Sequence, residues 1–215
     1  RVVELDHGRI VLDERIADYV PACKAAGGWN DVRFRDALDM ATGHFESVRY
    51  DEDEKSPAML PFFIAEDHLT KIDFACRHFP RRAAPGTQWV YHTIDTYVLG
   101  TALEAFVKQK LDPGRDFYHD IIVTRLWAPL ALSPVLRETR RTRDLAAQPF
   151  TGWGLTLHRD DIARLGAFLA APGIPKIDGI APFDERELRV ALQRDPADRG
   201  LRAIDDSFRY ARGFW

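Results

Sequence analysis

The sequence predicts a mainly α fold with a few short strands near its two ends. Between Asp13 and Gln193, apolar residues recur every three or four positions in successive segments. This is the spacing of helices that pack one face against a core. Strand-like segments occur at 8–12 and 208–215. The 215 residues suffice for one large domain or two small ones with a sizeable core.

The first element is predicted to be the end of a helix. Val2, Val3 and Leu5 have the spacing of its last turns, and Gly8 is a suitable C-terminal stop. We therefore expect this helix to begin before residue 1. Next along the chain, Cys23 and Cys76 form no metal or redox motif. We expect two free thiols here, with a disulfide between them as the alternative.

Buried helical stripes are predicted at 34–41, at 64–79 and from Thr93 or Asp95 to residue 107. Between the first two stripes, residues 44–62 are polar and irregular and include the charged run 51–55. Such runs are typical of solvated segments, so we expect a surface loop there.

Composition excludes several classes of function. The net charge of −3 and pI of about 6.2 give no reason to expect nucleic acid as a partner, and no apolar run is long enough to span a bilayer. Neither a zinc-hydrolase histidine pair nor a glycine-rich nucleotide loop is present. We therefore predict no metal and no cofactor, and a small-molecule or peptide substrate as the partner. The oligomeric state stays open.

The stretch 85–100 is the strongest candidate for chemistry. Pro85-Gly86 is a turn signal, and Tyr91 follows just before a predicted helix. A tyrosine at the mouth of a helix is held rigidly near backbone N–H groups and the positive helix end. The alternative is that Tyr91 is a packed aromatic residue with a bonded hydroxyl.

This stretch resembles the second motif region of the penicillin-recognising serine hydrolases, in the branch of class C β-lactamases, related esterases and D-Ala-D-Ala peptidases. Those proteins have a Pro-Gly turn, then Tyr-x-Asn, then a helical Leu-Gly pair. Tyr91 falls on the family tyrosine and Leu99-Gly100 on the pair, whereas Thr93 stands where the family usually has asparagine. The segments 8–21, 32–44, 126–132, 151–165 and 208–215 resemble the same family in its order.

The resemblance implies Tyr91 as a catalytic residue, with Thr93 and His92 in substrate binding. For His92 the alternative is a ring that faces away from the substrate. Activating a serine hydroxyl needs a proton acceptor, which the family supplies with Ser-x-x-Lys. None of the serines has a lysine three positions on, and the family's Lys-Thr-Gly or His-x-Gly strand is also missing.

The resemblance therefore implies one incomplete β-lactamase-like domain over 1–215. This is mostly the helical subdomain, with 8–12 and 208–215 as strand remnants of the α/β part. The implied function is that of a fragment of a serine hydrolase, which acts by acyl transfer on an ester, an amide or a β-lactam. The chain alone is expected to be inactive. The alternative is a non-catalytic relative that binds a peptide or protein partner. The compartment, exported or cytoplasmic, stays open.

Overall fold

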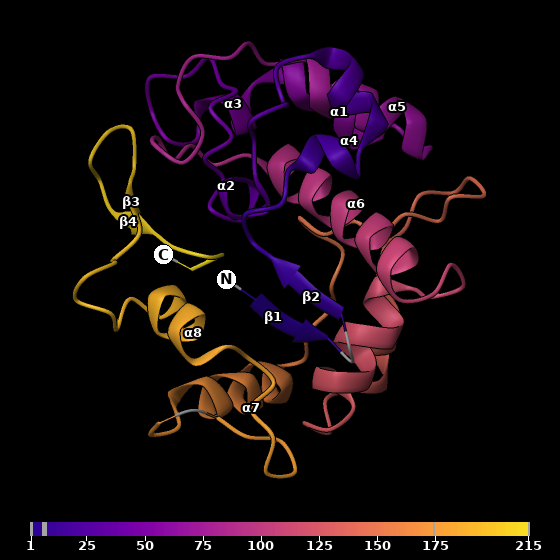
Figure 1. Ribbon diagram of the computed structural model, residues 1–215, viewed down its shortest axis with the longest axis vertical. Coiled ribbons are helices and arrows are strands. Elements are labelled where there is room, and N and C mark those ends of the chain that lie inside the picture. The colour runs from indigo at the N-terminus through magenta and orange to yellow at the C-terminus, as the bar shows by residue number, and fades with distance from the viewer. Residues whose placement is uncertain (1, 6–7, 174, 215) are drawn as a thin grey trace.

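The computed structural model describes residues 2–5, 8–173 and 175–214, with side chains from residue 12 onward. Helices dominate, as the sequence predicts, and the strands of the described residues form two antiparallel pairs, β1–β2 and β3–β4 (Figure 1). The strands are β1 (Val2–Leu5), β2 (Gly8–Val11), β3 (Leu201–Arg202) and β4 (Arg209–Tyr210). The helices are η1 (Ile16–Asp18), α1 (Pro21–Ala26), α2 (Phe34–Leu38), α3 (Glu52–Lys55), η2 (Pro57–Met59), α4 (Leu60–Ile64), α5 (His68–Arg77), α6 (Thr93–Lys110), the π-helix η3 (Phe117–Trp127), η4 (Pro134–Arg137), α7 (Arg159–Ala170) and α8 (Glu185–Ala191).

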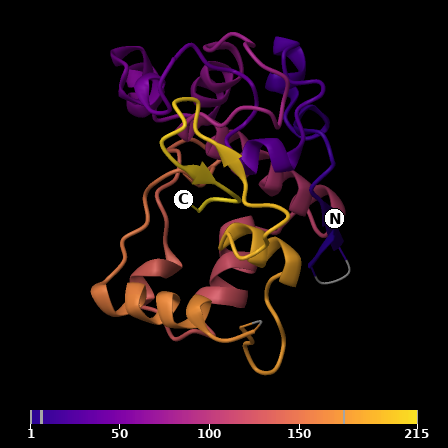
Figure 2. The same cartoon turned by 90° about the vertical axis from the view of Figure 1, so that its left-hand side faces the viewer.

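The helices lie in two groups. Helices α1 to α6 gather in the upper part of Figures 1 and 2, and α7 and α8 lie in the lower part. The β3–β4 hairpin lies beside the upper group in both views. A parallel bridge between Trp89 and Ala203 ties this hairpin to the segment that enters α6.

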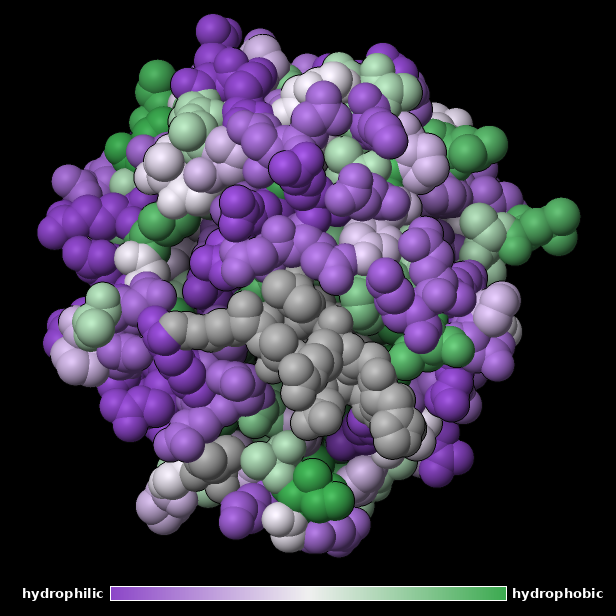
Figure 3. Space-filling model, viewed as in Figure 1, coloured by the Kyte–Doolittle hydropathy of each residue, from purple (hydrophilic) through white to green (hydrophobic). Residues whose placement is uncertain are grey.

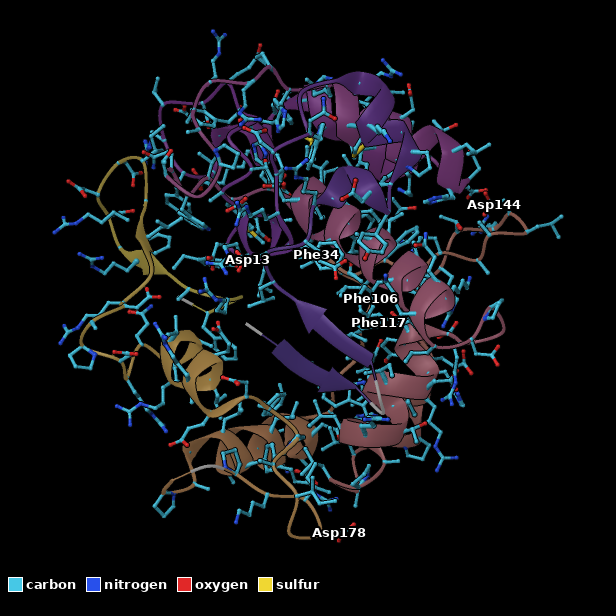
Figure 4. All side chains as sticks on the ribbon, viewed as in Figure 1. Asp13, Phe34, Phe106, Phe117, Asp144 and Asp178 are labelled. Atoms are coloured by element: carbon cyan, nitrogen blue, oxygen red, sulfur yellow. A yellow bond between two sulfur atoms is a disulfide. The ribbon has the colours of Figure 1, made fainter. Side chains whose placement is uncertain are left out.

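Helix α6 forms the centre of the main core, because most of its residues are buried. The Phe106 ring lies 5.6 Å from the Tyr19 ring and 6.3 Å from the Phe34 ring, and Figure 4 shows Phe34 and Phe106 between α2 and α6. Aromatic pairs at such separations add to the hydrophobic gain of burial. The helix that carries the candidate site is therefore packed firmly into the main core.

The prediction of a helix end at the start of the chain is wrong. Residues Val2–Leu5 form strand β1, which pairs with β2 in the register Val2–Val11 to Leu5–Gly8. The β-branched Val2 and Val3 favour extended backbone, and Gly8 lies within β2 instead of ending a helix.

The prediction of two free thiols is also wrong. Cys23 on α1 and Cys76 on α5 form a disulfide, with Cα atoms 4.8 Å apart. This distance is within the range that a disulfide spans. Packing of α1 against α5 brings the two residues together, and no local sequence pattern encodes that contact.

The predicted helix at 64–79 is present as α5 but is shorter than predicted, because it begins at His68, and Ile64 is the last residue of the separate helix α4. The Asp67 carboxylate caps α5 by accepting from the Thr70 N–H at 2.8 Å. No helix among the described residues is long and apolar enough to cross a membrane. The face of the molecule in Figure 3 is mostly hydrophilic, with scattered hydrophobic groups.

Candidate active site

The turn that carries Tyr91 is fixed by backbone hydrogen bonds to the segment after α2. Gly86, at φ 74°, donates its N–H to Ala41 at 2.8 Å, and Val90 donates to Met40 at 3.2 Å. A Cβ at Gly86 would also lie only 2.9 Å from Asp36 Oδ1, so only glycine fits this turn. Tyr91 in turn donates its N–H to the Tyr50 carbonyl at 2.7 Å. The backbone of the candidate catalytic residue is therefore held at several points.

The Tyr91 side chain is half-buried against a cluster built on Met40, Trp89, Ala203 and Tyr210. Burial raises the pKa of the Tyr91 phenol, and the nearby Glu54 carboxylate raises it further, whereas a hydrogen bond with the Thr93 side chain lowers it. The net direction is upward, so Tyr91 is a neutral phenol at neutral pH.

Thr93 is the first residue of α6 and is buried. Its backbone N–H donates to Glu54 Oε2 at 2.9 Å, and its hydroxyl donates to Glu54 Oε1. Glu54 thus satisfies an N–H of the first helical turn, which has no partner within the helix. The position where the family has an asparagine amide holds a threonine hydroxyl bound to a carboxylate.

His92 is almost fully buried, and its Nε2 lies 2.8 Å from Asp53 Oδ2. Its ring stacks on Phe79 with 4.6 Å between ring centres. Burial raises the pKa of Asp53, but the hydrogen bonds from His92 and the Glu46 N–H outweigh it and lower the pKa overall. In this placement the His92 ring has no open surface for a substrate.

The interpretation of the charged run 51–55 as a solvated loop is wrong. Part of the run is helix α3, Asp53 is 5% exposed, and the Glu54 carboxylate binds Thr93. The inward orientation of Asp53 and Glu54 could not be predicted from the sequence, because their partners His92 and Thr93 lie 39 positions away.

Asp95 is a further buried carboxyl beside the candidate site that the sequence analysis did not identify as a site residue. It lies in the first turn of α6 and accepts from the Thr42 hydroxyl at 3.1 and 3.2 Å. Complete burial raises its pKa to about 7, although His92 and Thr42 oppose the shift. The sequence predicts Asp95 or Thr93 as the cap of this helix, but both lie inside α6, whose N-cap is His92. The burial of Asp95 depends on packing against the Thr42 segment.

The other wall of the site is the segment 150–153. A Cβ at Gly152 would lie 2.5 Å from Thr93 Cγ2 and 2.6 Å from Thr96 Oγ1, so glycine permits this close approach. Behind the segment, the fully buried Lys71 lies with Nζ 4.7 Å from the Phe150 ring and 5.2 Å from the Trp153 ring. Lys71 Nζ also donates to the Phe62 carbonyl.

The structure thus brings Tyr91, Thr93 and Glu54 together, and directs His92 toward Asp53. A hydroxyl-rich site of this kind can orient and transfer protons, but the sequence has no serine with a lysine three positions on. A separate apolar pocket of about 390 Å³ lies between η3, α7 and α8 and is lined by residues such as Trp127, Leu165 and Phe168. None of the residues that line it belongs to the Tyr91 turn.

The family model described as Beta-lactamase matches residues 3–173. The chain belongs to the beta-lactamase family.

Solved structures agree on the fold. A protein from Bacillus anthracis, described as a "putative 6-aminohexanoate-dimer hydrolase", superposes with a TM-score of 0.64 at 16% identity, covering 94% of this chain and 51% of that one. A "putative beta-lactamase" from Bacteroides dorei DSM 17855 gives 0.53 at 15% identity, covering 85% and 48%. The chain therefore spans about half the length of these structures. A comparison with curated proteins finds no match.

Proposed function

We propose that the chain is part of a serine hydrolase that acts by acyl transfer on an ester, an amide or a β-lactam. The nucleophile is supplied by residues outside 1–215. In this proposal 1–215 is one incomplete domain, mostly its helical subdomain, and the segments 8–12 and 208–215, which contain β2 and β4, are remnants of the α/β part. Membership of the family and the half-length match to the solved structures support this division.

The observation that carries the proposal is the Tyr91 hydroxyl, which is held by a hydrogen bond to Thr93 at the start of α6. A nucleophilic serine needs a neighbour that accepts its proton and returns it to the leaving group. Tyr91 is the catalytic residue in this role. Thr93, beside the Tyr91 hydroxyl, is the substrate-binding residue in this proposal, and His92, held by Asp53, fixes the backbone that joins Tyr91 to Thr93.

Binding without catalysis is the second candidate function. The polar groups of Thr93 are already bound to Glu54, and His92 is bound to Asp53. Both contacts reduce the number of groups available to a substrate. A relative with these features could bind a peptide or a protein partner without turnover.

The test is the full-length protein with Tyr91→Phe, assayed against activated esters, amides and β-lactams. The substitution keeps the ring and removes the hydroxyl, so kcat should fall about 10²–10⁴-fold, the usual contribution of a positioned acid–base group. Tyr97→Phe is the matched control. Tyr97 lies on α6 one helical turn after Thr93, and its hydroxyl lies 2.9 Å from His68 Nδ1.

Near-full activity in Tyr91→Phe would remove Tyr91 from the mechanism. A full-length protein without turnover that nevertheless binds a peptide, as measured by calorimetry, would support the binding function instead.

A further inference from the structure

The Glu54 carboxylate connects with the Tyr91 hydroxyl through one intervening residue. Glu54 accepts from both the backbone N–H and the hydroxyl of Thr93, and the Thr93 hydroxyl is hydrogen-bonded to the Tyr91 hydroxyl. Three side chains from α3, the turn and α6 thus form a continuous chain of oxygen atoms. This chain runs from the half-buried phenol to a half-buried carboxylate.

The number of available protons fixes the direction of these hydrogen bonds. A carboxylate can only accept, and a threonine hydroxyl has a single proton to donate. That proton goes to Glu54 Oε1. Tyr91 must therefore donate its own proton to Thr93 Oγ1. Toward any third group, such as an attacking hydroxyl, the Tyr91 oxygen can then act only as an acceptor.

We propose that Tyr91, Thr93 and Glu54 form a proton relay in which Glu54 is the terminal acceptor and the positioning residue for Tyr91. This inference rests on the proposed acyl-transfer function. A neutral phenol is a very weak base, so Tyr91 alone would be a poor proton acceptor. In the relay the phenol accepts one proton while it gives up another, so no phenolate forms.

With an ester or amide substrate, the nucleophile's oxygen forms a bond to the carbonyl carbon, and the carbonyl π electrons move to the carbonyl oxygen. The O–H proton of the nucleophile passes to the Tyr91 oxygen, the Tyr91 proton to Thr93 Oγ1, and the Thr93 proton to Glu54. When the tetrahedral intermediate collapses, the relay runs in reverse and the proton leaves with the alcohol or amine.

Burial and the neighbouring Glu54 carboxylate both raise the pKa of Tyr91. The phenol therefore stays protonated at neutral pH, as the relay requires.

The first test needs no activity. In this chain, labelled with ¹³Cζ-tyrosine, NMR follows the ionisation of Tyr91, which is assigned with Tyr91→Phe. Glu54→Gln removes the charge but keeps an oxygen that can accept from Thr93, so the pKa of Tyr91 should fall by about one unit. Glu52→Gln, two residues away on α3, makes the same charge change and should leave Tyr91 unchanged. Equal titration in the three proteins would overturn the relay.

The second test uses the full-length enzyme. Glu54→Gln cannot accept a proton, so kcat should fall about 10²-fold with KM little changed. Thr93→Val should lower kcat similarly because it removes the bridging oxygen. Thr93→Ser should restore activity close to the starting value, a rescue that a purely structural role for the threonine methyl would not show.

The two proposals fail in different ways. Full activity of Glu54→Gln and Thr93→Val, with Tyr91→Phe inactive, would overturn the relay and leave the acyl-transfer function intact. Unchanged activity in all three variants would overturn the proposed function together with the role of Tyr91. If Glu54→Gln does not fold, the Thr93→Val and Thr93→Ser pair decides between the same outcomes.

Discussion

Helices α6 and α7 contrast sharply in how they are covered. Apolar residues on most sides of α6 are buried in the main core, whereas the buried residue of α7 is a carboxylate, Asp161. Asp161 accepts from Ser133 N–H at 2.8 Å and from His158 N–H at 3.0 Å, so it closes a loop and caps the helix. Ile162 on α7 is 60% exposed. The core around α6 is complete, but the apolar side of α7 is only partly covered by the described residues.

This contrast has a consequence for function. The candidate site lies at the start of the well-covered helix α6, while the apolar pocket lies along α7 and α8. The chain covers about half of the solved structures that it matches. Preorganisation of catalytic groups requires firmly held side chains. The described residues around the start of α6 thus hold the Tyr91 backbone firmly, which the role proposed for this tyrosine requires.

The largest expected effect comes from truncating one phenylalanine on each helix. Phe106→Ala should lower the free energy of unfolding by about 3–5 kcal/mol, because Phe106 is 1% exposed in the main core. Phe168→Ala on α7 should cost only about 1 kcal/mol, because its ring is partly exposed and lies 6.2 Å from Phe183. Urea titration measures both. Equal losses would show that the two helices are equally well covered.

Removing the disulfide that joins α1 to α5 should have the next largest effect on the free energy of unfolding. The bridge joins residues 53 positions apart, and closing such a loop stabilises by about 4 kcal/mol in the chain-entropy model. Reduction with dithiothreitol should lower the melting temperature. The double variant Cys23→Ala, Cys76→Ala should melt lower and no longer respond to the reductant. An unchanged melting temperature on reduction would contradict this prediction.

The sequence predicted those features that depend on neighbouring residues. The helical stripe from Thr93 to residue 107 and the turn at Gly86 were predictable because their periodicity and turn chemistry are local. Glu54 could not be identified as a partner of Thr93, because 39 residues separate them. The disulfide was only the alternative to two free thiols, because its cysteines lie 53 positions apart. Charge patterning on 51–55 indicated solvent, whereas packing buries Asp53 against His92.

Asp95, in the first turn of α6, should make the free energy of unfolding depend on pH. Its folded-state pKa is raised from 3.8 to about 7, so between about pH 4 and pH 7 the folded state binds more protons than the unfolded state. Stability should therefore fall as pH rises through this window, by roughly 2 kcal/mol between pH 5 and pH 8. Asp95→Asn should remove most of this fall.

Urea titrations at both pH values measure the effect, and Asp73→Asn is the control. Asp73 is an exposed carboxylate on α5 that pairs with Arg77, so its replacement should leave the pH dependence as it is. The same fall in Asp95→Asn as in the unaltered chain would show that Asp95 ionises normally.

The smallest expected effect comes from Lys71, the cation behind the segment 150–153. Burial, together with the Arg140 charge and against the opposing influence of Asp67, lowers its pKa from 10.5 to about 8. The unfolded state thus binds more protons between about pH 8 and pH 10.5, so stability should rise with pH across that window.

Lys71→Met should abolish this rise. At pH 7 it should change the free energy of unfolding by only about 1 kcal/mol, because lost cation–π contacts are offset by removal of a buried charge. Melting temperatures of both proteins at pH 7.5 and pH 10 test this, and a parallel rise in the two would show that other groups cause it.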